Sequence, residues 1–107
     1  MATREMPKRF TLTKQRHPAL VRAVEAVGEA AHAEGPIDGK TAQLIQLAAA
    51  VAIRSEGATH SHTRRAHERG ATEEEVRQAV LLLPSTSGWP GVGAGRSGVD
   101  EALEQRP

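Results

Sequence analysis

The side chains best suited to chemistry lie in one short stretch, Arg54 to His67, which reads Arg-Ser-Glu-Gly-Ala-Thr-His-Ser-His-Thr-Arg-Arg-Ala-His and holds three of the five histidines. Imidazole gains and loses a proton near neutral pH, so it is a common general acid or base. Arginine can hold a carboxylate through two parallel hydrogen bonds. The stretch predicts cofactor-free acid–base chemistry on a small organic acid, with His62 moving the proton and Arg54, Arg64 or Arg65 holding the acid group.

A helix that begins at a Ser55 cap and runs to Arg69 is expected to carry these residues. Ser55, Ala58, Thr59 and His62 recur at positions i, i+3, i+4 and i+7, so they share one face of that helix. The unpaired backbone N–H groups at its start would favour an anionic group of a substrate. We therefore count Ser55 with His62 among the candidate catalytic residues.

Glu56 lies in the first turn of this helix, where a carboxylate either complements the helix dipole or acts on a substrate. We include Glu56 among the candidate catalytic residues. His60 and His62 are separated by one residue, so they point about 200° apart on a helix and cannot share a metal ion. We expect neither a metal site nor a cofactor, and we assign His60 to substrate binding together with Arg64 and Arg65.

Two helices are predicted before this stretch. The first begins at His17-Pro18, with proline in its first position, and ends at Gly35-Pro36. The second is capped by Asp38 and runs from Lys40 to Arg54. It is apolar nearly all round, which is typical of a helix buried on most sides at the centre of a domain. The apolar stripe of the first helix consists of Leu20, Val21, Val24 and Val27.

Two further helices are predicted after the histidine stretch. Thr72 and Glu75 form a capping box for the first of them, which Pro84 ends, and Pro84 to Gly88 is predicted to be a turn. Trp89 to Glu104 predicts a last helix whose glycines allow close packing against a neighbour, with Trp89 in the core or an interface. No segment alternates with period two for long enough to make a strand, so the predicted fold class is all-α.

The length and composition indicate one small domain. The chain has 107 residues, of which we assign 17–107 to the domain and 1–16 to a basic N-terminal arm. Phe10 is the only aromatic residue in the arm and no basic face continues beyond it, so we do not expect a nucleic-acid partner. Large apolar side chains are scarce, whereas there are 18 alanines. We therefore expect a homo-oligomer whose subunits complete one another's cores.

Cysteine is absent, which excludes disulfides and thiolate chemistry. No apolar run approaches the roughly 20 residues that span a bilayer, and the N-terminal residues lack the apolar core of a signal peptide. We expect no membrane partner and a cytoplasmic location.

Several segments carry a family resemblance in the same order and spacing. They are Asp38-Gly39-Lys40-Thr41, the Ser-Glu-Gly-x-x-x-Ser-His run from Ser55 to His62, Gly70-Ala71-Thr72-x-Glu74-Glu75 and Gly88-Trp89-Pro90. Over residues 36–103 the chain resembles the carboxymuconolactone decarboxylase and AhpD-like alkylhydroperoxidase superfamily. The resemblance implies an AhpD-like bundle of about five helices that assembles into trimers or hexamers.

The peroxidase branch of this superfamily uses a Cys-x-x-Cys pair, a histidine and a glutamate. By position the cysteines fall on Ser55 and Ala58, the histidine on His62 and the glutamate on Gln43, so only the histidine is retained. Serine and alanine cannot form a disulfide, and glutamine cannot accept a proton as glutamate does. The dithiol mechanism therefore cannot operate, and Gln43 joins the candidate catalytic residues by position alone.

The chain resembles the decarboxylase branch through a different set of residues. This branch lacks the cysteine pair and keeps the residues that are here Glu56, Gly57 and His62, although it has an acid where this chain has Ala58. Three alternatives stay open. The first is a decarboxylase-like or lactone-type enzyme. The second is a catalytically silent binding or assembly module, and the third is an AhpD-like peroxidase whose cysteines were replaced in this sequence.

Overall fold

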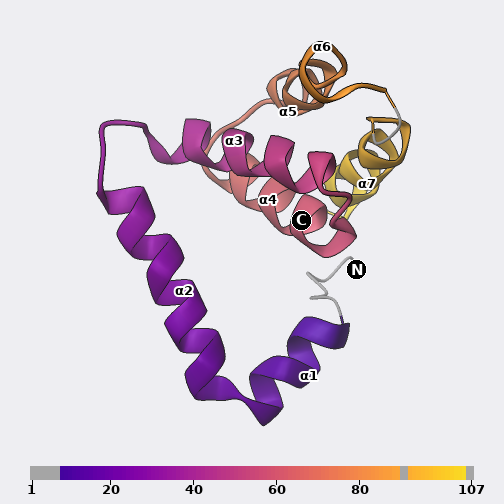
Figure 1. Ribbon diagram of the computed structural model, residues 1–107. Helices are drawn as coiled ribbons and strands as arrows, with labels where there is room; N and C mark the ends of the chain where they lie inside the picture. Colours follow the sequence, from indigo (N-terminus) through magenta and orange to yellow (C-terminus); the bar gives the residue numbers. More distant parts are fainter. Residues whose placement is uncertain (1–7, 90–91, 106–107) are drawn as a thin grey trace. The chain divides into compact units, whose positions relative to one another are not determined.

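The computed structural model of the protein describes residues 8–89 and 92–105, and over these residues it contains helices and no strand (Figure 1). This confirms the predicted all-α class. Residues 1–7 of the predicted arm, and residues 90 and 91 of the predicted last helix, lie outside the described part. The helices fall into two compact units, one with α1 and α2 and one with α3 to α7.

The first unit contains α1 (Lys8–Arg16) and α2 (Pro18–Ala33). The helix α1 covers part of the predicted basic arm, where no helix was expected. The helix α2 begins with proline in its first position and ends just before Gly35-Pro36, as predicted. Its apolar stripe contains one buried residue, Val21, and three exposed residues, Leu20, Val24 and Val27.

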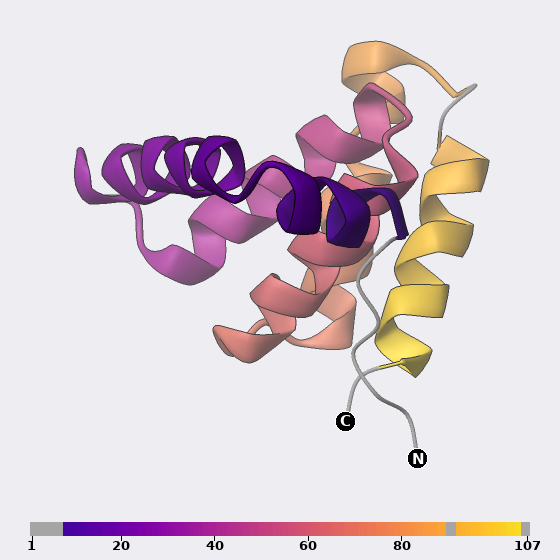
Figure 2. The ribbon, with the colours of Figure 1, turned by 90° about the horizontal axis from the view of Figure 1, so that it is seen from below.

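The second unit begins with α3 (Gly39–Ala52), whose cap is Asp38 as predicted. The Thr41 backbone N–H donates to Asp38 Oδ1 over 2.7 Å, and this bond lowers the pKa of the carboxyl group. The helix contacts α4 (Glu56–Glu68), α5 (Glu73–Leu81) and α7 (Val92–Glu104), and α4 also contacts α5 and α7, so α3 and α4 together form the centre of this unit (Figure 2). The helix α3 is buried or half-buried on most sides, as predicted, and its exposed positions are Thr41, Ile45, Ala49 and Ala52.

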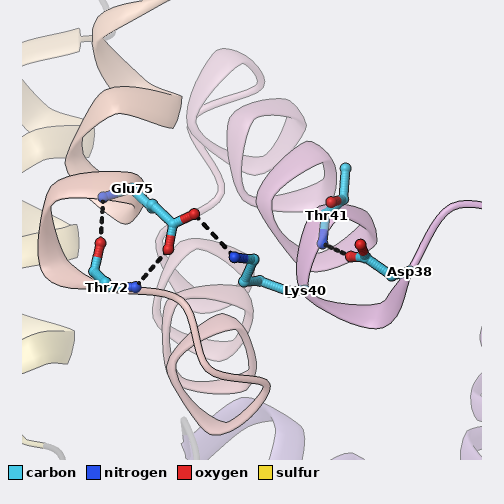
Figure 3. Close-up of polar contacts among 5 residues, drawn as sticks. All are labelled: Asp38, Lys40, Thr41, Thr72 and Glu75. Atoms are coloured by element: carbon cyan, nitrogen blue, oxygen red, sulfur yellow. Dashed lines mark hydrogen bonds and ion pairs between the residues drawn. The ribbon is translucent and has the colours of Figure 1, made fainter.

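The capping box of α5 also joins α5 to α3 (Figure 3). The Glu75 N–H donates to Thr72 Oγ1 over 3.1 Å, and the Thr72 N–H donates to Glu75 Oε1 over 2.9 Å. The second oxygen of Glu75 accepts from Lys40 Nζ over 3.0 Å. The Thr72 N–H and the Lys40 ammonium lower the pKa of Glu75, because both favour the carboxylate. The N-terminal ends of two helices are thereby held together.

The segment after α5 differs from its prediction. Pro84 does not open a turn but occupies the first position of a short helix, α6 (Pro84–Ser87). Proline is favoured there because its missing N–H would have no helical partner. Gly88 ends α6 with a φ of 87°, which glycine adopts without strain. Trp89 was predicted to lie in the core or in an interface; it is exposed, so it does not lie in the core, and an interface role stays a prediction.

The helix α7 packs against α3 and α4 through its glycines, as predicted. A Cβ atom on Gly95 would collide with Cγ1 of Val51, and one on Gly98 would lie 3.3 Å from Cγ2 of Thr59. Arg77 of α5 adds a polar link, since its Nε donates to Asp100 over 3.1 Å. The core of the unit consists of buried Leu47, Val51, Ala66, Ala71, Val76, Ala79, Val80, Val99 and Leu103.

Candidate functional site

The turn from α3 into α4 holds an arginine in an unusual backbone conformation. Arg54 has a φ of 59°, in the left-handed region. The Ser55 N–H donates to the Ala50 carbonyl over 2.9 Å, and the Arg54 N–H donates to the Val51 carbonyl over 3.0 Å, which is a Schellman motif. The same motif ends α4, where Gly70 takes the left-handed position. A residue other than glycine costs roughly 1–2 kcal/mol in this position. The backbone alone therefore favours glycine over Arg54.

Arg54 lines a cleft of about 370 Å³ between the start of α4 and α7. The side of α7 that faces the cleft includes Gly95 and Gly98, whose lack of side chains lets α7 approach Val51 and Thr59 closely. The guanidinium of Arg54 and the positive end of the α4 dipole favour an anionic group at this end of the cleft, whereas Glu56 and Glu101 add negative charge to its lining. The polar residues that line it are Arg54, Ser55, Glu56, Thr59, Ser97 and Glu101.

Ser55 caps α4, as predicted. Its Oγ accepts from the Ala58 N–H over 3.3 Å, and the Thr59 hydroxyl donates to the Ser55 carbonyl over 2.8 Å. These contacts stabilise the first turn of the helix, which is what an N-cap serine does. The hydroxyl oxygen thus has a structural partner, and the catalytic role expected of Ser55 stays a prediction.

His62 and Gln43 are brought together from α4 and α3. His62 Nδ1 lies 2.7 Å from Gln43 Oε1, and because a carbonyl oxygen only accepts, the imidazole donates through Nδ1–H. Gln43 is buried, whereas His62 is half-buried. A neutral ring that carries its proton on Nδ1 has its lone pair on Nε2. The pair inferred from the family resemblance therefore exists as a direct contact.

His60 lies on a different face of α4 and contacts a residue that the sequence analysis missed. His60 Nε2 is 3.1 Å from Glu101 Oε2 on α7. Glu56, one turn before His60, also belongs to this group, and each of the three residues brings one oxygen or nitrogen atom within 4.8 Å of the others. Glu101 has no local signal, because 41 residues separate it from His60 and only the packing of α7 on α4 brings them together.

The two predicted substrate-binding arginines lie on α4 and do not line the cleft. Arg64 is half-buried and Arg65 is exposed. Arg65 follows His62 by three residues, so the two side chains are neighbours on the helix surface. The structure thus separates His62, with Gln43 and Arg65 beside it, from Ser55 and Glu56, which line the cleft. His60 does not line the cleft but contacts Glu101, which does.

Comparisons with known proteins support one family. A family model described as the carboxymuconolactone decarboxylase family matches residues 18–101. The crystal structure of a carboxymuconolactone decarboxylase family protein from Legionella pneumophila, determined in an apo form, superposes with a TM-score of 0.78 at 23% identity, covering 92% of this chain and 88% of that chain. No curated protein matches. In the part of the chain that the structure describes, no helix is long and apolar enough to cross a bilayer.

Proposed function

Since the chain belongs to the carboxymuconolactone decarboxylase family, we propose that it performs cofactor-free acid–base chemistry on a small organic acid, as a decarboxylase-like or lactone-type lyase in which His62 moves the proton. The observation that supports this proposal is the 2.7 Å hydrogen bond between His62 Nδ1 and Gln43 Oε1. A general base needs a defined tautomer and orientation, and this bond supplies both.

Gln43 stands at the position where the peroxidase branch has a glutamate, but its amide carries no charge. Because the amide is neutral, it orients the imidazole but does not stabilise the imidazolium as a carboxylate would. The neutral ring accepts a proton at Nε2, and the resulting imidazolium returns one from the same atom. In a decarboxylation, the carbon–carboxylate bond breaks, carbon dioxide leaves, and the carbanion takes the proton from Nε2. No oxidant or reductant is needed for this step.

Arg65 is the residue that we expect to hold the acid group beside His62. It follows His62 by one turn of α4 and is exposed, so its guanidinium can reach a carboxylate near the imidazole. A bound carboxylate near the ring favours the imidazolium and raises the pKa of His62. Binding of the acid would thereby favour the protonated form of His62, which later donates the proton.

The test is an NMR pH titration of the histidine ring signals with and without small dicarboxylates and lactone acids. We expect a saturable rise in the pKa of His62 with at least one of these acids. His62→Ala should remove the linked titration and any decarboxylation while the fold is retained. His32→Ala, which changes a histidine on α2, should behave as the parent protein does.

Two outcomes would reject acid–base chemistry at His62. One is a His62 titration that no acid changes. The other is a His62→Ala variant that releases carbon dioxide from a substrate of the parent protein at the parent rate. Gln43→Leu adds a second readout, because it should change the His62 tautomer in nitrogen chemical shifts without removing the imidazole.

A second candidate function is binding without catalysis, and the cleft favours it. His62 is absent from the described residues that line the cleft, whereas Arg54 is present despite its unfavourable φ. A conformation that costs free energy is a reason to look for a function of the side chain. Arg54→Gly should stabilise the turn but weaken acid binding if the cleft is the binding site. If Arg65→Gln weakens binding instead, the His62 face is the binding site.

We also propose a homo-oligomer, a trimer or a hexamer as the family resemblance implies. Leu20, Val24 and Val27 are exposed along α2, and among the described residues of this two-helix unit only Val21 is buried. Burying such a stripe between copies would supply apolar area that a chain of this size lacks. Light scattering at micromolar concentration should give a mass of three or six chains, and Val24→Glu should reduce it. A stable monomer in the parent protein would exclude this assembly.

A further inference from the structure

We propose that Glu56, His60 and Glu101 form a binding site for a divalent first-row transition-metal ion. The three residues contribute two carboxylates and one imidazole, with one potential ligand atom of each within 4.8 Å of the others. Imidazole and carboxylate are both ligands of Zn²⁺ and related ions. The sequence predicted no metal site, because His60 and His62 point apart on α4 and cannot share an ion. Glu101 on α7 is a partner for His60 that only the packing of the helices provides.

The positions of the three residues follow from two helices. Glu56 and His60 are four residues apart on α4, so their side chains lie one above the other on one face. Glu101 comes from α7, where Gly98 allows close approach. A Cβ atom on Gly98 would lie 3.3 Å from Cγ2 of Thr59 and 4.0 Å from Nε2 of His60. Glu101 follows Gly98 by three residues, and this contact therefore directs its carboxylate towards the imidazole.

The distances suit an ion after small side-chain rotations. Ligands bound at about 2.1 Å in a tetrahedral site are separated by about 3.4 Å. His60 Nε2 and Glu101 Oε2 are already 3.1 Å apart. The side chain of His60 is 20% exposed and that of Glu101 is 60% exposed. The imidazole is therefore held in place by packing, whereas the carboxylate is free to rotate towards the ion.

The cleft supplies the open side of the site. Glu56 and Glu101 both line it, so an ion between them would face a space of about 370 Å³. Three protein ligands and one open position are the arrangement in which a divalent ion binds water or a substrate group. Arg54 lines the same cleft, and an acid held there would lie within reach of the ion. The metal site is independent of the His62 chemistry, because it uses another face of α4.

Isothermal titration calorimetry with Zn²⁺ tests the site directly on the whole chain. We expect one saturable Zn²⁺ ion per chain, and we expect Glu101→Gln and His60→Ala each to weaken its binding by about tenfold or more. Glu104→Gln is the matched control, since Glu104 is an exposed acid on the same helix outside the group. It should bind Zn²⁺ as the parent protein does.

Paramagnetic Mn²⁺ provides a second, local readout. Substoichiometric Mn²⁺ should broaden the ring signals of His60 before those of the other histidines, including His62. The proposal is overturned if Zn²⁺ shows no saturable binding, if Glu101→Gln binds as tightly as Glu104→Gln, or if Mn²⁺ broadens all five histidines alike. In that case the contact between His60 and Glu101 only joins α4 to α7. None of these results depends on how His62 titrates.

Discussion

Gly95→Ala should destabilise the α3–α7 unit by about 1–3 kcal/mol, which is the usual effect of overpacking a well-packed core. The added Cβ would collide with Cγ1 of Val51, a side chain that is 1% exposed and cannot rotate into solvent. To make room, α7 would have to move away from α3. Chemical denaturation followed by far-UV circular dichroism measures this loss of stability as a lower denaturant concentration at the unfolding midpoint.

Gly93→Ala is the control for this experiment, because it makes the same change in the same helix. Gly93 is exposed and a Cβ there meets nothing within 4 Å. Alanine also forms helix better than glycine, so this variant should be as stable as the parent or slightly more stable. If both variants unfold at the parent midpoint, α7 does not pack on α3 through Gly95.

Leu47→Ala should destabilise the same unit by about 2–5 kcal/mol, the range found when a buried leucine is truncated to alanine. Leu47 is 0% exposed at the centre of α3, within the core that α4, α5 and α7 share. Few other side chains there are as large, so the cavity left behind cannot be filled easily. Small domains are stable by only about 5–15 kcal/mol. The variant is therefore expected to be partly unfolded at moderate temperature.

Ile45→Ala is the matched control, since it removes a branched side chain of the same size from the same helix. Ile45 is 53% exposed, and its truncation should change the free energy of unfolding much less than that of Leu47. If both variants lose the same free energy of unfolding, α3 does not bury Leu47 and expose Ile45 as the structure shows. If the exposed side of α3 is covered in an oligomer, Ile45→Ala will also lower the mass measured by light scattering.

Local interactions along the chain were enough to predict where most helices begin and end. Asp38, Ser55 and Thr72 each cap a helix, and Pro18 occupies the first position of α2. A cap depends on hydrogen bonds to N–H groups two or three residues away, so the signal lies within one turn of sequence. The all-α class was also predicted from a local pattern, because no segment alternates with period two.

Tertiary packing decided what local sequence could not. The helical period of α4 shows that His60 and His62 point apart, but only the packing of α3 and α7 shows that one meets Gln43 and the other Glu101. Likewise, the composition of α3 does not distinguish buried Leu47 from exposed Ile45. Contacts between residues far apart in sequence depend on how whole helices pack against one another. For that reason Gln43 could be inferred only from the family resemblance, and Glu101 could be found only in the structure.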